Sequence, residues 1–281
     1  MLLDGKKVKE DSLKELKRNF SEIKSSLAVI QIGDDFASNK YIKQKEKLAK
    51  ELNVDFNHIK IEESTTEELC SIINNLNEDK NTNGIIIQLP LPKEIDYDTI
   101  RNTIDPNKDV DGVTDKNIVR LINNDKDVLI PCTALGIMKI LDYYNINLKG
   151  LDVTIIGRSI HIGKALYSLM LNRDATVTLC HSKTKDIKKH TKNSDLIVTS
   201  VGKADFIHQD MIKDDAIIID VGFNYKDNKI CGDVSDDVKN YKYLTPVPGG
   251  VGQMTVYSIY ENLYKAYNLQ HKKNKTIIKK K

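Results

Sequence analysis

Tryptophan is absent from this 281-residue sequence, and aromatic residues make up only 6% of it. Proteins that bind single-stranded nucleic acid stack the bases on aromatic side chains, so this composition argues against that class. Charge gives the same answer, because 43 basic and 40 acidic residues leave a net charge of only +3. A balance this mild does not indicate a nucleic-acid surface, and we expect no nucleic-acid partner.

Cysteine is also scarce, and long apolar runs are missing. No two of the four cysteines form a C-x-x-C pair, which argues against a zinc site and against a disulfide framework. We therefore expect no metal, and reduced thiols in a cytoplasmic protein. No run approaches 18 apolar residues and no apolar segment follows a basic start, so we expect neither a membrane span nor a signal peptide.

Short apolar runs alternate with amphipathic stretches along most of the chain. Runs rich in Ile and Val that are separated by helices are typical of parallel sheets covered on both faces, which predicts an α/β fold. The predicted strands are 26–33, 55–61, 84–90, 152–157, 175–180, 195–202 and 216–222. The predicted helices are 6–24, 36–52, 65–79, 133–145, 162–172 and 254–268. The part from Leu151 onward reads as a separate βαβ unit, with a boundary near 123–127.

One lysine lies on the unexpected side of the helix predicted over 36–52. At about 100° per residue, Lys45 falls in the middle of the apolar arc, one turn after Tyr41, whereas the other lysines after Tyr41 fall on the far side. The commoner arrangement for an isolated case is snorkelling, in which the stem packs and the ammonium reaches water. The functional alternative is a desolvated amine with a lowered pKa that transfers protons near neutral pH.

Polar residues follow two apolar stretches in the first half of the chain. Gln88 ends the strand "GIIIQLPLP", and ligands of open α/β sheets gather at the carboxyl ends of strands. The alternative is an amide that satisfies loop backbone groups. "PNKDVDGVT" supplies Asp109 and Asp111 beside Gly112. Asp-Gly is usually a turn, but a carboxylate there could also accept paired N–H donors from a planar heterocycle.

"DVTIIGRSIHIGKAL" reads as strand, glycine loop and helix, the context in which backbone N–H groups bind a phosphate. The spacing from Gly157 to Gly163 departs from G-x-G-x-x-G, so the match to the generic fingerprint is weak. The next strand ends in "CHSK" without the acidic residue that holds the ribose of NAD. Arg158 and the cation and hydroxyls at that strand end favour the 2′-phosphate of NADP instead. The alternative is that His181 and Lys183 merely decorate a strand end.

A constrained loop, "TPVPGGVGQMT", precedes the last predicted helix and holds two prolines and three glycines. Such a loop brings backbone close to a ligand or to another domain more readily than it forms an ordinary surface turn.

Together these stretches resemble the bifunctional methylenetetrahydrofolate dehydrogenase/methenyltetrahydrofolate cyclohydrolase family. The matching segments occur in the family's order and reach to about Asn262. They include "ASNKYIKQKEK", "GIIIQLPLP", "KDVDGVT", "PCTALG", "IIGRSIHIGKAL", "GDV" and "TPVPGGVGQMT". The resemblance implies an enzyme of one-carbon metabolism that oxidises 5,10-methylenetetrahydrofolate with NADP and hydrolyses the product to 10-formyltetrahydrofolate.

The resemblance also implies a fold of two α/β domains with the active-site cleft between them, usually in a homodimer. It predicts a catalytic domain over residues 1–120, joined by a returning C-terminal helix over 254–270. It further predicts a Rossmann-like NADP-binding domain with a parallel sheet over 121–253. Residues 271–281 are expected to be a frayed basic tail.

By the same resemblance, Lys45 is the catalytic lysine and Gln88 hydrogen-bonds its amine. Tyr41 lies against the pterin, and Asp111 holds the pterin's amino edge. The substrate loop, Pro248, Gly249 and Gly250, lies nearby.

For the cofactor, the resemblance assigns NADP contacts to Arg158, Ser159 and Ser182, and Thr133 lines that site. Gly157 and Gly163 belong to the same cofactor-binding set.

The sequence departs from the family pattern at three prolines, replaced by Ala134, Ala165 and Gln253. None of these changes removes a proposed reactive group, so we expect them to affect preorganisation more than reaction type. Three rivals remain at this point. One is another NADP oxidoreductase of the same architecture, resembling shikimate dehydrogenase. The second is a folate- or nucleotide-binding protein without catalysis. The third, nucleic-acid binding, rests only on the basic tail.

Overall fold

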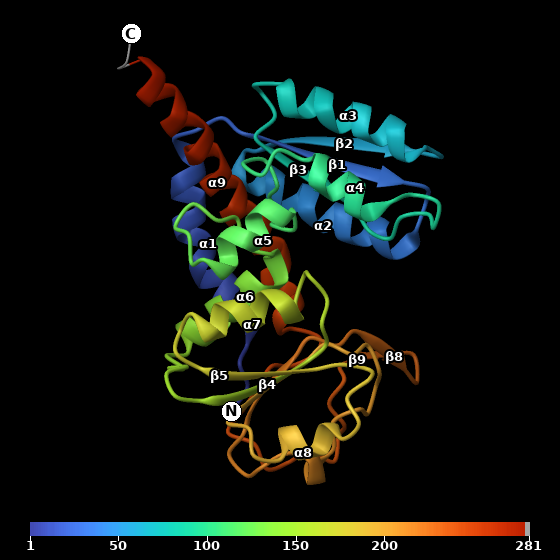
Figure 1. Cartoon of the computed structure of the whole chain (residues 1–281), viewed down its shortest axis with the longest axis vertical. Helices are drawn as coiled ribbons and strands as arrows, with labels where there is room; N and C mark the ends of the chain where they lie inside the picture. The colour runs from blue at the N-terminus through green and yellow to red at the C-terminus, as the bar shows by residue number, and fades with distance from the viewer. Residues whose placement is uncertain (279–281) are drawn as a thin grey trace. The chain divides into compact units, whose positions relative to one another are not determined.

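The computed structural model describes residues 1–278, which form two compact units. The first unit comprises Met1–Asp11 and Pro131–Thr255, and the second comprises Ser12–Ile130 and the chain from Val256 onward. Two long helices, α1 (Gly5–Ser21) and α9 (Val251–Ile278), contribute residues to both units (Figure 1). The predicted domain boundaries at residues 120 and 253 remain predictions.

The second unit contains a parallel sheet of three strands in the order β2-β1-β3. Its strands are β1 (Ser26–Ile32), β2 (Asp55–Ile61) and β3 (Gly84–Ile87). The chain passes from β1 to β2 on one side and later to β3 on the other. The carboxyl end of β1 is therefore the point where the strand order reverses, which is where open α/β sheets bind ligands.

Four helices lie wholly in the second unit. They are α2 (Phe36–Leu52), α3 (Thr66–Glu78), α4 (Tyr97–Thr103) and α5 (Asp115–Ile122). Ile30 and Ile32 point to the face where α3 and α4 pack, and that cluster is fully or almost fully buried. Because strand side chains alternate between faces, Gln31 points to the opposite face, where it donates to Asn39 of α2.

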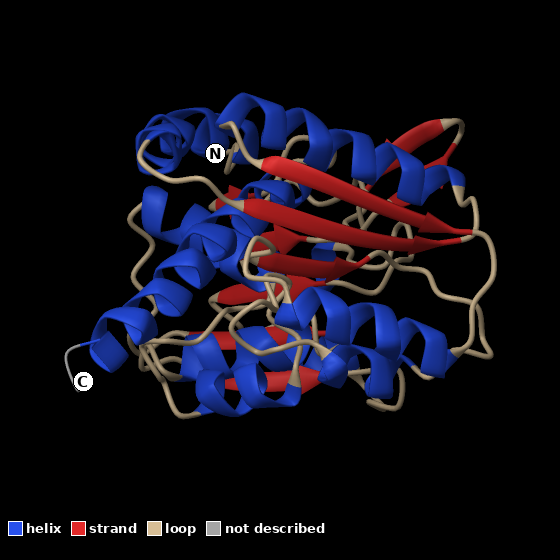
Figure 2. Ribbon diagram, turned by 90° about the horizontal axis from the view of Figure 1, so that it is seen from above, coloured by secondary structure: helices blue, strands red, loops and turns tan. Residues whose placement is uncertain are grey.

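The first unit contains a parallel sheet of five strands in the order β10-β7-β6-β4-β5. Figure 2 shows strands in red and the helices that pack on them in blue. The strands are β4 (Asp152–Ile156), β5 (Thr176–Cys180), β6 (Leu196–Thr199), β7 (Ile217–Asp220) and β10 (Tyr243–Leu244). The helices are α6 (Cys132–Tyr143), α7 (Gly163–Leu171), α8 (Ile187–Thr191) and the 3-10 turn Gln209–Met211. A hairpin is formed by β8 (Asn224–Lys226) and β9 (Lys229–Cys231).

In the first unit the strand order reverses at β4, because β5 lies on one side of it and β6 on the other. The carboxyl ends of β4 and β6 therefore border the crevice in which this architecture binds dinucleotides. The α/β prediction and the parallel sheets are confirmed, and each predicted strand and helix has a counterpart in the structure.

Several short elements escaped prediction: α4, α5, α8, the hairpin and β10. Helix α9 also runs to Ile278, so the predicted frayed tail from His271 is helical that far; residues 279–281 lie outside the described part of the chain. Within residues 1–278, no helix is both long and apolar enough to cross a bilayer. In the same part of the chain, no three or more His, Cys, Asp or Glu residues gather as metal ligands.

Candidate functional site

Helix α2 carries Lys45 and is fixed at both ends by its own sequence. Asp35 caps the amino end by accepting from Ser38 N–H at 2.7 Å, and Asn53 closes the carboxyl end in the left-handed conformation. Buried residues then recur at Ile42, Lys45, Leu48, Ala49 and Leu52, which is one face of the helix. The prediction that Lys45 lies in the apolar arc is confirmed: the residue is only 7% exposed.

The amine of Lys45 is held inside the unit rather than at its surface. Lys45 Nζ donates to Gln88 Oε1 at 2.7 Å, and both residues are buried. Gln88 Nε2 donates to the carbonyl of Leu89 at 2.7 Å, so the amide oxygen is the atom left facing the amine. The same carbonyl accepts from Ser38 Oγ at 2.9 Å, which ties the end of β3 to the first turn of α2. Snorkelling does not describe this lysine, and the predicted contact with Gln88 is present.

Helix α9 supports the turn of α2 that carries this lysine. Tyr260 is completely buried, and its hydroxyl donates to the backbone carbonyl of Lys45 at 2.5 Å. Burial also raises the pKa of the Tyr260 phenol, which therefore stays a neutral donor. The amine is thus positioned from two sides, by β3 through Gln88 and by α9 through the helix backbone.

A turn beside the sheet carries Asp111. An isolated parallel bridge joins Ile85 to Asp109, and Ile85 N–H donates to the carbonyl of Lys108 at 2.7 Å. The chain turns directly after this bridge, because Val110 N–H donates to the Lys108 carbonyl at 2.9 Å and Gly112 N–H donates to the Asp109 carbonyl at 3.1 Å. Asp111 is half-buried.

A buried aspartate holds the turn that presents Asp111. Asp109 is fully buried, and its carboxylate accepts from Gly112 N–H at 2.9 Å and Thr114 N–H at 2.8 Å. It also accepts from Asn117 Nδ2 at 2.9 Å. Burial raises the pKa of Asp109, while these donors act in the opposite direction. Sequence reasoning noted Asp109 only as part of a turn and missed this role.

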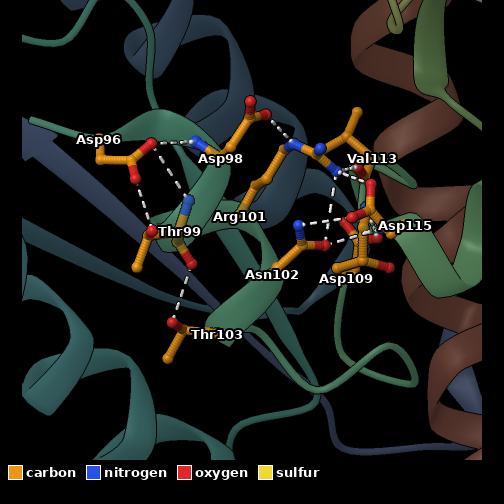
Figure 3. Close-up of polar contacts among 10 residues, drawn as sticks. Asp96, Asp98, Thr99, Arg101, Asn102, Thr103, Asp109, Val113 and Asp115 are labelled. Carbon is orange, nitrogen blue, oxygen red and sulfur yellow. Dashed lines mark hydrogen bonds and ion pairs between the residues drawn. The ribbon is translucent and has the colours of Figure 1, made fainter.

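Arg101 holds the same turn from its carbonyl side (Figure 3). Its guanidinium is nearly buried and donates to the carbonyl of Val113 at 2.8 Å. It also pairs with the exposed carboxylates of Asp98 at 2.8 Å and Asp115 at 2.7 Å. The hydrogen bond with Arg101 holds the pKa of Asp115 below its usual range. Side chains therefore bind both backbone N–H groups and a backbone carbonyl of this turn.

Tyr97 is a second residue near this turn that the sequence did not reveal. Burial raises the pKa of its phenol, and the neighbouring carboxylates of Asp111 and Asp109 raise it further. The phenol therefore stays protonated beside Asp111 at neutral pH. A tyrosine at the start of a seven-residue helix has no sequence signal that distinguishes it from a packing residue.

The predicted phosphate loop lies at the switch point of the first unit. Gly157 follows β4 with φ 126°, and a Cβ on Gly163 would lie 1.8 Å from the carbonyl oxygen of Gly157. Only glycine allows this close crossing of loop and helix, which is the packing that dinucleotide-binding turns use. Helix α7 begins there, and its N-cap residue, Ile162, supplies no side-chain cap. Lys164 N–H donates to the Ser159 carbonyl at 3.0 Å, and the other backbone N–H groups at the start of the helix can serve a phosphate. The loop therefore fits a dinucleotide.

The residues predicted to read the 2′-phosphate are exposed around this loop. Arg158 and Ser159 follow Gly157, and Ser182 lies in the turn after β5. Lys183 N–H donates to His181 Nδ1 at 3.1 Å, which shapes that turn. In the described residues no ion pair engages Arg158, so its guanidinium is available to an anion.

Tyr41 is half-buried on α2 in the second unit, one turn before Lys45. The other predicted residues lie in the first unit. Thr133 is in the first turn of α6, with its hydroxyl 3.4 Å from that of Thr255. In the substrate loop, Pro248–Gly250, Gly249 has φ 110° and its carbonyl accepts from Lys6 N–H at 3.1 Å. The structure thus brings Lys45 and Gln88 into contact and places Asp111 in a turn of the same unit. It places the substrate loop and Thr133 in the other unit.

Comparison with protein families gives two matches in sequence order. The model described as tetrahydrofolate dehydrogenase/cyclohydrolase, catalytic domain, matches residues 3–111. The model described as tetrahydrofolate dehydrogenase/cyclohydrolase, NAD(P)-binding domain, matches residues 131–271. The bifunctional protein FolD of Clostridium tetani is 43% identical over 274 residues, which covers 94% of this chain and 98% of that protein.

Solved structures agree with these sequence matches. The bifunctional enzyme FolD, methylenetetrahydrofolate dehydrogenase/cyclohydrolase, from Campylobacter jejuni superposes with a TM-score of 0.93 at 40% identity, covering 96% of this chain and 99% of that one. The Trypanosoma brucei FolD, complexed with NADP cofactor and inhibitor, superposes with a TM-score of 0.90 at 30% identity, covering 96% and 98%.

Proposed function

Because the chain belongs to the tetrahydrofolate dehydrogenase/cyclohydrolase family, we propose that it catalyses two successive reactions on a folate one-carbon unit. The first oxidises 5,10-methylenetetrahydrofolate to 5,10-methenyltetrahydrofolate with NADP⁺. The second hydrolyses the methenyl cation to 10-formyltetrahydrofolate. Family membership decides against the rival oxidoreductase that resembles shikimate dehydrogenase.

In the dehydrogenase step, a hydride leaves the one-carbon bridge and the bridging carbon becomes the methenyl cation; NADP⁺, when bound, accepts that hydride. The protein's part is to bind and orient. Gly157, Gly163 and the first turn of α7 hold the pyrophosphate. Arg158, Ser159 and Ser182 bind the 2′-phosphate, and Thr133 lines the site.

In the cyclohydrolase step, water adds to the methenyl carbon, the bond from that carbon to N5 breaks, and one proton from the water is released as N5 gains a proton. Lys45 transfers protons around that carbon, and Gln88 keeps its amine in place. Tyr41 packs on the pterin, Asp111 accepts N–H donors from the pterin's amino edge, and Pro248–Gly250 completes the substrate contacts.

The observation that carries this proposal is the buried contact between Lys45 Nζ and Gln88 Oε1. The hydrogen bond to Gln88 fixes where the buried amine lies. A buried amine that is held in one position suits a group that must gain and lose a proton beside a cationic substrate.

An acid-quenched time course with purified protein, 5,10-methylenetetrahydrofolate and NADP⁺ tests the proposal. Acid converts the formyl product back to methenyl, so total oxidation and free methenyl can be compared. NADPH formation without methenyl accumulation is the expected result. Accumulating methenyl would mean that the hydrolytic step is impaired, and no NADPH would favour the binding protein without catalysis.

The proposal also covers the domain organisation of the chain. We assign the catalytic domain to residues 1–120 with the returning helix 254–270, and the NADP-binding domain to 121–253.

A cytoplasmic location fits the four cysteines, none of which forms a disulfide in the structure. Family resemblance supports a homodimer. Phe223 and Tyr225, at the β8–β9 hairpin, also support it, because both are exposed and their rings pack edge to face. Light scattering tests the dimer.

A further inference from the structure

A second buried aspartate, Asp233, shapes a loop next to the phosphate loop. The loop Ser200–Lys203 follows β6 at the carboxyl edge of the first unit's sheet. Its successive backbone N–H groups converge on the carboxylate of Asp233, with Val201 at 2.7 Å, Gly202 at 3.4 Å and Lys203 at 2.9 Å. Three consecutive donors aimed at one carboxylate fix the path of the loop.

Both oxygens of the Asp233 carboxylate accept hydrogen bonds. Asp233 is completely buried, and it also accepts from Thr199 Oγ1 at 3.0 Å and from Asn224 Nδ2 at 3.0 Å. Each of its two oxygens therefore faces at least two donors. The five donors leave neither oxygen of this buried carboxylate without hydrogen bonds.

A second carboxylate fixes the segment that carries Asp233. Asp220, at the end of β7, accepts from the backbone N–H groups of Asp233 and Val234, each at 2.9 Å. A Cβ on Gly222 would lie 2.3 Å from Asp233 Oδ1, and one on Gly232 would lie 1.9 Å from Asp220 Oδ2. Both glycines are thus required by the close approach of backbone to these two carboxylates.

The loop adjoins the phosphate loop directly. Ser200 N–H donates to the carbonyl of Ile156 at 2.9 Å, and a Cβ on Gly157 would lie 2.3 Å from Ser200 Oγ. Val201 and Lys203 are exposed at this edge. The loop is therefore the β6 side of the crevice whose β4 side is the phosphate loop.

We propose that Asp233 is a positioning residue for the dinucleotide: it holds Ser200–Lys203 as the β6 wall of the NADP site without touching the cofactor itself. The inference rests on the proposed function, and it extends that function by naming the group that builds this wall. Releasing the loop should weaken cofactor binding, because a mobile wall must be ordered again each time the dinucleotide binds.

The test compares Asp233→Asn with Asp237→Asn, a matched change in the same unit. Asp237 is half-exposed and bonds to His208 and Gln209 instead. In Asp233→Asn, one oxygen becomes an NH₂ group that faces N–H donors. We expect the KM for NADP⁺ to rise about tenfold, the change that follows from leaving one or two buried donors unpaired. Asp237→Asn should leave this KM unchanged.

Hydrolysis of supplied 5,10-methenyltetrahydrofolate, measured without cofactor, separates positioning from general damage. The inference requires that Asp233→Asn keep the wild-type hydrolysis rate while its KM for NADP⁺ rises. An unchanged KM, or an equal loss of both activities, would overturn it. Should Asp233→Asn not fold, Thr199→Val removes a single donor with little change of shape. It should raise the same KM about twofold to fivefold, and an unchanged KM in that variant would likewise overturn the inference.

The proposed function fails in a different way. Wild-type protein that neither oxidises 5,10-methylenetetrahydrofolate nor hydrolyses the methenyl compound would contradict the proposed function. An active wild type with an insensitive Asp233→Asn variant contradicts only the positioning role.

Discussion

Each unit has a buried aspartate whose carboxylate holds a nearby loop. Asp109 in the second unit accepts from the N–H groups of Gly112 and Thr114, and Asp233 in the first accepts from those of 201–203. In both places the hydrogen bonds to one carboxylate fix the path of the loop. Loops beyond strand ends are the variable parts of α/β folds, so function needs such local anchors.

The two anchors differ in the charged residue that supports them. Arg101 supports the turn held by Asp109, because it donates to the Val113 carbonyl and pairs with two exposed carboxylates. The segment that carries Asp233 is instead fixed by a second buried carboxylate, Asp220. Burial raises the pKa of Asp220 to about 6, and Asp233 adds to that shift. The Asp233 anchor should therefore respond to pH through Asp220 as well as to loss of hydrogen bonds.

The largest effect on stability is expected where a single residue serves the most buried donors. Asp109→Ala leaves the N–H groups of Gly112 and Thr114 and the Asn117 amide without their acceptor. We expect a loss of about 3–6 kcal/mol in the free energy of unfolding, measured by urea denaturation. Asp111→Ala is the matched control, because the free energy should change by about 1 kcal/mol or less while folate turnover falls. Equal destabilisation by both changes would contradict the anchor.

The second prediction concerns the pH dependence of stability at Asp220, which supports the Asp233 anchor. Asp220 ionises near pH 4 when unfolded but near pH 6 when folded, so the folded protein binds this proton more tightly. Its contribution to stability is therefore fully present below about pH 4 and is lost as pH rises to 6. The loss amounts to about 3 kcal/mol, from the difference between the two pKa values.

Urea unfolding of the wild type and Asp220→Asn across pH 4–7 measures this loss. The difference between the two proteins cancels the titration of other carboxylates. As pH rises, the free energy of unfolding of Asp220→Asn should increase relative to that of the wild type by up to about 3 kcal/mol. A difference that is constant with pH would show that Asp220 does not titrate in this range.

A smaller effect is expected at Arg101, where two of the partners are exposed carboxylates. Arg101→Met removes the donor to the Val113 carbonyl and should reduce the free energy of unfolding by about 1–2 kcal/mol. The KM for the folate should rise because the Asp111 turn loosens. Arg101→Lys keeps the charge but not the planar fork, so it should recover only part of the loss. Full recovery would mean that charge alone matters here.

The sequence predicted most accurately the helices and strands that follow a regular hydrophobic pattern. Helix α2 has apolar positions at helical spacing and capping residues at both ends, so its bounds and the burial of Lys45 could be read directly. The strands of both sheets are continuous apolar runs between turns, which is the pattern of covered parallel strands. Gln88 could be placed at a strand end because prolines follow it.

The features that the sequence did not predict depend on tertiary structure. Helices α4 and α5 span only seven and eight residues, too short to show a clear period. Asp109 and Asp233 are charged, and charge by itself predicts exposure. Their burial is possible only because folded turns aim backbone N–H groups at them, and those turns form only when the chain is assembled. The hairpin of β8 and β9 did have a signal that was overlooked: Asp227 and Asn228 both adopt positive φ in its turn.

The most direct test of the central claim is hydrolysis of 5,10-methenyltetrahydrofolate by Lys45→Met, with Lys47→Met as control. Both changes remove one lysine from α2, but Lys45 is buried against Gln88 whereas Lys47 is exposed. We expect the hydrolysis rate of Lys45→Met to fall by about 10²–10⁴-fold, the usual contribution of a positioned proton-transfer group. Lys47→Met should hydrolyse at the wild-type rate. Wild-type hydrolysis by Lys45→Met would contradict the account of this site.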